Sequence, residues 1–114
     1  MARKKSTSKP AMTNALVEEA ARQFTILSEP ARLILLRELM DGEESVGELV
    51  ERTGLKQGTV SKHLGILAGA GFVERERQGN FVIYRIADPV VFQLCELMCC
   101  RISESAKRRA ATLG

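Results

Sequence analysis

The sequence is poor in the residues from which catalytic sites are usually built. Its 114 residues include no tryptophan, one histidine and one tyrosine, and aromatic residues make up 4% of the chain. It has no apolar run of about 18 residues, the length that a membrane-spanning helix needs, so we expect no membrane partner. No apolar stretch follows the basic N-terminus, which argues against a secretory signal and predicts a cytoplasmic protein. We therefore expect a chain that is not an enzyme and holds no organic cofactor.

Cysteine is scarce and confined to one segment. The three cysteines, Cys95, Cys99 and Cys100, lie within six positions. An odd number of cysteines so close together argues against a disulfide framework and favours free thiols with local chemistry. No Cys-x-x-Cys pair is present, which disfavours a small thiol oxidoreductase.

Charge is distributed unevenly, although the formal net charge is only +3. Residues 1–10 carry +4, residues 11–51 carry −6, residues 52–85 carry +4, residues 86–100 carry −2 and residues 101–114 carry +3. A positive central segment next to an acidic one predicts a surface that meets a polyanion, with the acidic part facing elsewhere. Ordinary solvated surface charge gives the same pattern, so charge alone does not decide between the two.

Apolar periodicity predicts a mainly α protein with a small β-hairpin (α+β). We expect Ser28 to cap the second helix, with Pro30 in its first turn, and Ser45 with Glu48 has the spacing of a capping box. The predicted order is helix, helix, helix, helix, strand, strand, helix. The expected helices cover residues 11–27, 30–40, 45–53, 56–67 and 89–107, and the strands cover residues 72–77 and 81–86.

The chain has the length of one domain. We expect residues 14–106 to form that domain, which serves DNA binding and dimerisation. Residues 1–13 are expected to form a disordered basic tail, and residues 107–114 a flexible one.

The order of the central elements predicts a winged helix-turn-helix. A short helix, a tight turn, a helix with a polar outward face and a basic hairpin follow one another directly. An α-helix fits the major groove of B-DNA, and hairpin arginines reach phosphates or the minor groove. Double-stranded DNA is therefore the expected partner. The predicted DNA-binding residues are Lys56, Gln57, Thr59, Ser61, Lys62, His63, Arg75, Arg77, Asn80 and Arg85.

Several stretches carry a specific resemblance to a known family. They include FTILSEPARLILLREL at 24–39, QGTVSKHLGIL at 57–67 and GAGFV at 69–73. In these stretches the chain resembles the ArsR/SmtB family of winged-helix repressors, over about residues 15–103. The resemblance implies a homodimer, built through the first and last helices, that releases a palindromic operator when it senses a metal, metalloid or sulfur species. The interface then includes Leu16, Val91, Leu94, Met98 and Ile102.

The sequence departs from two effector sites of that family. Arsenic-sensing members carry a Cys-x-Cys pair where this chain has Ser45 and Gly47, and no histidine follows Asp88 as it does in the zinc-sensing members. The last helix instead offers Cys95, Cys99 and Cys100 as candidate metal ligands. Soft thiolates favour As(III) or Sb(III) as the effector over zinc, which takes four ligands.

Three interpretations of the cysteines stay open. Cys95 and Cys99 are one helical turn apart, whereas Cys100 lies about 100° round from Cys99, so three thiolates need an unwound helix or a second subunit. In the first interpretation they bind As(III) or Sb(III). In the second, a pair of thiols is oxidised to a disulfide or polysulfide link. In the third they are small apolar interface residues that bind no effector. A purely architectural DNA-binding protein is a further, less favoured, alternative.

Overall fold

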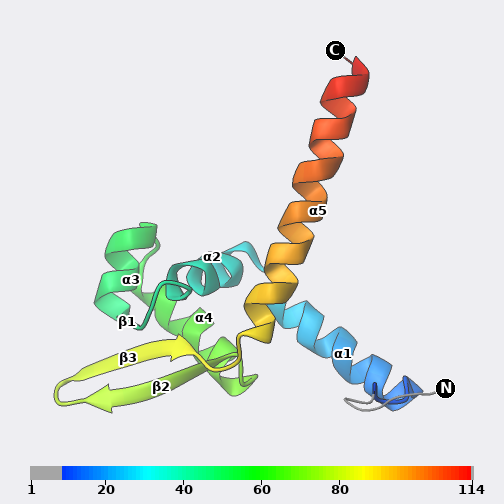
Figure 1. The fold of residues 1–114 in the computed structure, drawn as a ribbon. Helices are drawn as coiled ribbons and strands as arrows, with labels where there is room; N and C mark the ends of the chain where they lie inside the picture. The colour runs from blue at the N-terminus through cyan, green and yellow to red at the C-terminus, as the bar shows by residue number, and fades with distance from the viewer. Residues whose placement is uncertain (1–8, 114) are drawn as a thin grey trace.

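The computed structural model describes residues 9–113 (Figure 1) and confirms the predicted mainly α fold with its hairpin. One short strand, β1, was not predicted, because two residues give no periodic signal. The predicted basic tail over residues 1–13 falls mostly on residues 1–8, which lie outside the described residues. The elements are α1 (Asn14–Leu27), α2 (Pro30–Leu39), β1 (Glu44–Ser45), α3 (Val46–Thr53), α4 (Gln57–Gly69), β2 (Val73–Gln78), β3 (Phe81–Ile86) and α5 (Val90–Leu113).

Helix α3 begins and ends as the sequence predicts. The Ser45 hydroxyl accepts a hydrogen bond from the Glu48 N–H at 3.1 Å, and the Glu48 carboxylate accepts one from the Ser45 N–H at 2.7 Å. This reciprocal pair satisfies two donors that the first turn would otherwise leave open. At the other end Gly54 has a φ of +74°, which a residue with a Cβ adopts only with strain. The short helix is therefore fixed at both ends.

Two predictions about helix ends are wrong: the capping role of Ser28 and the end of the last helix. Ser28 does not cap α2: its hydroxyl donates to the Thr25 carbonyl at 2.8 Å and so closes α1 instead. Helix α2 begins at Pro30 without a side-chain cap, and proline at this position adds no unpaired N–H to the first turn. Helix α5 continues to Leu113 and does not end near Lys107, so the segment predicted as a flexible tail is helical up to that residue.

The hairpin belongs to a three-stranded antiparallel sheet in the order β1-β3-β2. Val73 at the base of β2 is buried against α4, and the alternation of a strand places Arg75 and Arg77 on the same face as Val73. The opposite face of β2 carries Glu74 and Glu76. The free end of the hairpin projects beyond the helices (Figure 1), so the two faces of this wing are chemically different.

The core lies between α2, α3, α4 and the sheet. Leu35, Leu49, Val60 and Leu64 are fully buried there. Val91, predicted to contact a partner chain, is 2% exposed and packs in this core, because it lies at the start of α5 where the helix leaves the body. No helix within residues 9–113 is both long and apolar enough to cross a membrane.

Helices α1 and α5 extend away from the core in different directions (Figure 1). Both leave apolar side chains exposed, and these side chains cannot all be covered by the small body of the same chain. Large exposed apolar clusters of this kind mark interaction surfaces. The exposed apolar residues on the two helices are Leu16, Val17, Phe24, Val90, Leu94, Leu97, Met98 and Ile102.

The capping box gives the first prediction. Ser45→Ala removes one of its two hydrogen bonds and should lower the free energy of unfolding by about 1 kcal/mol. Urea denaturation followed by circular dichroism, at one protein concentration, measures this change. Ser61→Ala is the matched control, because Ser61 is exposed within α4 and caps no helix. An equal loss in both variants would contradict the prediction.

Candidate nucleic-acid interface and thiol cluster

The outward face of α4 is polar and accessible. Val60 and Leu64 on its inner face are fully buried and hold the helix on the core. The predicted residues Lys56, Gln57, Ser61 and Lys62 are exposed, and Thr59 is half-buried. No side chain caps the N-terminus of α4, so the N–H groups of its first turn are open to an anion. This face offers donors and acceptors to a ligand that approaches from solvent.

His63 is not on that outward face, contrary to the prediction. The residue is 9% exposed, and Nδ1 accepts a hydrogen bond from Arg32 Nε at 3.1 Å. The reason is helical geometry, since His63 follows Val60 by three positions and therefore shares its inward side. The predicted DNA contact of His63 loses its basis.

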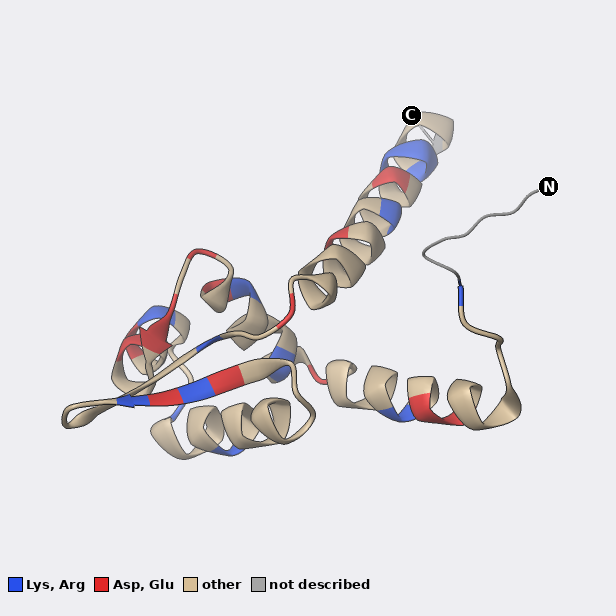
Figure 2. Cartoon of the chain, turned by 60° about the horizontal axis from the view of Figure 1, so that its bottom comes forward, with Lys and Arg blue, Asp and Glu red and all other residues tan. Residues whose placement is uncertain are grey.

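The wing arginines divide into two groups. Arg75 and Arg77 are exposed on the face of the hairpin turned toward α4, and Asn80 is exposed in the turn at the tip. Along β2 these cations alternate with Glu74 and Glu76, as Figure 2 shows. Because successive side chains point to opposite faces, one face of the strand is basic and the other acidic. The basic face is the one that Val73 buries against α4, so the basic side of the wing borders this helix.

Arg85 belongs to the acidic face and is held by three carboxylates. Its guanidinium lies 2.6 Å from Glu76, 3.3 Å from Glu74 and 3.4 Å from Glu43. The hydrogen bond that Arg85 donates to the Glu76 carboxylate is the main reason why the pKa of Arg85 is raised above its ordinary value. A phosphate contact by Arg85, as predicted, would have to compete with these carboxylates, so the structure gives it less support than Arg75 or Arg77.

The three cysteines lie on α5 without converging. Cys95 is half-buried, and Cys99 and Cys100 are exposed. The helix runs without a break from Val90 to Leu113, and no three His, Cys, Asp or Glu side chains within residues 9–113 gather as a metal site would need. One protomer therefore offers a pair of thiols one turn apart, and a three-thiolate site does not fit it as it stands. Burial, with a smaller contribution from Cys99, raises the pKa of the Cys95 thiol.

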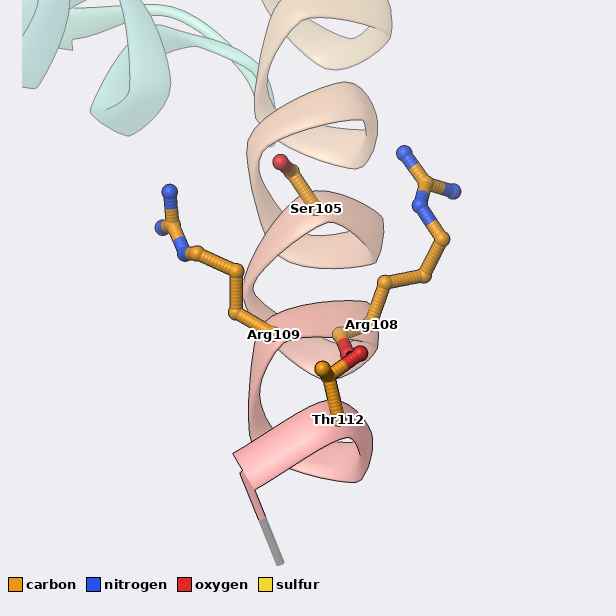
Figure 3. Close-up of a pocket in the computed structure, with 4 residues that line it drawn as sticks. All are labelled: Ser105, Arg108, Arg109 and Thr112. Atoms are coloured by element: carbon orange, nitrogen blue, oxygen red, sulfur yellow. Dashed lines mark hydrogen bonds between the residues drawn. The ribbon is translucent and has the colours of Figure 1, made fainter.

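A shallow hollow on the outer part of α5 does not form a second site. Its lining residues are Ser105, Arg108, Arg109 and Thr112. Figure 3 shows the two arginine side chains pointing to opposite sides of the helix. Groups that diverge in this way do not converge on a ligand.

Sequence reasoning missed part of the exposed apolar surface and the role of one half-buried arginine, Arg32. Leu97 follows Leu94 by three positions, so helical periodicity was a sufficient signal for it, and Phe24 on α1 is 56% exposed. Arg32 gave no signal, since its contacts with His63 and with the Ile26 carbonyl come from packing between helices.

The sequence and the structure are similar to those of known regulators. Residues 29–75 match the family described as bacterial regulatory protein, arsR family. The chain is 37% identical over 89 residues to a probable mercury resistance operon repressor of Streptomyces lividans. The aligned region covers 78% of this chain and 71% of that protein.

Two solved structures have the same fold. The antimony-specific transcriptional repressor AntR superposes with a TM-score of 0.76 at 33% identity, over 89% of this chain and 92% of that one. The homodimeric winged helix-turn-helix DNA-binding domain of a possible ArsR-family transcriptional regulator from Mycobacterium bovis gives a TM-score of 0.75 at 30% identity, over 90% and 95%.

The environment of the thiols predicts their order of reactivity. Cys95 should be alkylated by iodoacetamide more slowly than Cys99 and Cys100 at pH 7.5, because it is half-buried and its raised pKa leaves less thiolate. Peptide mass spectrometry over a time course measures the three rates. Raising the pH should speed the alkylation of Cys95, since more of its thiol then ionises. Fastest labelling at Cys95 would contradict the prediction.

Proposed function

Because the chain belongs to the ArsR family of bacterial regulatory proteins, we propose that it is a homodimeric repressor that binds operator DNA and releases it when Sb(III) or As(III) binds the thiols of α5. The DNA-binding part is supported by the exposed, polar face of α4 together with a wing whose basic face borders this helix. Helix α4 enters the major groove, where Gln57, Ser61 and Lys62 reach bases and phosphates, and Arg75 and Arg77 contact the neighbouring backbone.

The exposed apolar surface of α1 and α5 supports the homodimer. Phe24, Leu97, Met98 and Ile102 are each more than half exposed in the protomer, which is costly unless a partner covers them. A second copy of the chain, related by a two-fold axis, buries the same patch on both protomers. Such a dimer sets its two α4 helices about 34 Å apart, one turn of B-DNA, and reads a palindrome.

The thiols support a soft effector that couples to the dimer. Cys95 and Cys99 share one face of α5, and Cys100 lies about 140° round from Cys95 in an ideal helix. A third thiolate therefore joins the pair only when α5 changes shape or when the other protomer supplies it. Either change acts on a helix of the proposed dimer interface. The similarity to an antimony-specific repressor supports a trivalent metalloid as the ligand.

A mercuric ion is the second candidate effector. The regular helix already brings two thiols, Cys95 and Cys99, onto one face, and two soft thiolates are the coordination that Hg(II) prefers. The similarity to a probable mercury resistance operon repressor points the same way. The two candidates differ in their need for Cys100.

The DNA-binding surface gives a mutational prediction. Lys62→Ala and Arg77→Ala should each weaken binding to a duplex from the chain's own upstream region about 10-fold at moderate salt. Each should also reduce the slope of log affinity against log salt concentration by about one. Fluorescence anisotropy across a salt series measures both quantities. Arg108→Ala is the charge-matched control, because Arg108 belongs to the last turns of α5, and the C-terminal end of this helix projects away from the wing (Figure 1). Unchanged affinity in both test variants would overturn the proposed interface.

The effector gives a second mutational prediction. Replacing Cys95, Cys99 and Cys100 together by serine should leave operator affinity intact and abolish release by antimonite and arsenite. A metalloid that needs three thiolates should no longer release the operator from Cys100→Ser. Hg(II) bound by Cys95 and Cys99 should still release it from the same variant. Mobility-shift titrations with antimonite, arsenite, Hg(II), zinc and a polysulfide compare the candidates. Release by antimonite from the triple variant would place the sensor elsewhere, and release by polysulfide alone would favour the redox interpretation.

A further inference from the structure

We propose that Arg32 and His63 are positioning residues that hold the DNA-reading helix α4 in a fixed orientation relative to α1. The inference rests on the proposed function, because it concerns how the dimerisation helix and the reading helix are kept in register. His63 is not placed to touch DNA itself, since it is buried on the inner side of α4, and Nε and Nη1 of Arg32 donate to groups of the protein.

The guanidinium of Arg32 joins three helices. Arg32 belongs to the first turn of α2, its Nε donates to His63 Nδ1 on α4 at 3.1 Å, and its Nη1 donates to the Ile26 carbonyl on α1 at 2.9 Å. Helix α2 packs against both α1 and α4. The planar guanidinium holds its donors at fixed angles, so one side chain fixes both bonds at once.

The sequence explains why the Ile26 carbonyl accepts this bond. The carbonyl of Ile26 would normally receive the N–H of the residue four positions later in a continuing helix. That residue is Pro30, which has no N–H. Arg32 therefore satisfies a carbonyl that the α1–α2 junction leaves without its usual partner. A polar group without a partner at a half-buried junction is unfavourable, which favours this geometry over alternatives.

The chemistry of His63 makes the contact directional. Arg32 Nε can only donate, so Nδ1 of His63 is the acceptor in this hydrogen bond. His63 directly follows Ser61 and Lys62, two exposed residues of the proposed reading face. A shift of the His63 ring turns the helix that carries these residues, and a small misplacement of a positioned group is enough to lose much of its contact with a ligand. The orientation of α4 is thus tied to the α1–α2 junction.

Three variants test the proposal. His63→Leu keeps a side chain of similar size and removes the acceptor. His63→Asn is the matched control, because its side-chain oxygen stands near the position of Nδ1 and still accepts. Arg32→Lys keeps the positive charge and loses the two-donor geometry. Operator affinity is measured by anisotropy, the dimer by sedimentation velocity and folding by thermal denaturation, all on the full chain.

We expect His63→Leu and Arg32→Lys to weaken binding to the upstream duplex about 10-fold while both variants remain folded dimers. His63→Asn should stay within about threefold of the wild type. The double variant His63→Leu with Arg32→Lys should bind no more weakly than the weaker single variant, because residues that share one contact are not additive. If His63→Leu fails to fold, His63→Asn and Arg32→Lys decide the question.

Several results would overturn the proposal. Wild-type affinity in Arg32→Lys and His63→Leu would show that the contact does not position α4. An equal loss in His63→Asn and His63→Leu, or additive losses in the double variant, would show that the two residues act separately. If the wild-type protein itself shows no preference for its upstream region, the proposed function fails first, and this outcome is distinct from selective failure of the contact.

Discussion

The structure depends on the burial of a few leucines between three short helices. Leu35 on α2, Leu49 on α3 and Leu64 on α4 are all fully buried in one cluster. Because each helix is too short to be stable alone, this packing is what keeps it helical and fixes its angle to the others. The same packing turns the opposite side of α4 to solvent. An accessible reading face is therefore a direct consequence of how the core is built.

The β-sheet separates the acidic and basic side chains of the wing onto opposite faces, although they are mixed along the sequence. The segment 52–85 is basic overall, yet Glu74 and Glu76 lie on the face of β2 opposite Arg75 and Arg77 and bind Arg85. Ion pairs with carboxylates hold Arg85 on the acidic face, whereas Arg75 and Arg77 lie on the face that Val73 buries against α4. An alternating strand thus separates charges that are mixed in the sequence, and the wing gains one face that suits a polyanion.

Helices α1 and α5 are the part of the fold that a single chain leaves incomplete. Their apolar residues are exposed, and the cysteines of α5 do not converge within one protomer. These two facts have one physical origin, since a straight helix that projects from the body presents all its sides to solvent. Dimerisation and effector binding are therefore both expected to act on α5. The contact of Arg32 with Ile26 and His63 offers a connection from the α1–α2 junction to the reading helix.

The sequence alone determined the order of the five helices and the two hairpin strands, the capping box of Ser45 and Glu48, and the family, because periodicity, caps and turns are local. It also supplied most of the candidate DNA interface. Only the tertiary structure decided that His63 and Val91 are buried, that Arg85 is held by Glu43, Glu74 and Glu76, and that α5 continues to Leu113. These outcomes depend on which side of a helix or strand meets a neighbour. Such contacts join residues that are distant in the sequence, and no local pattern records them.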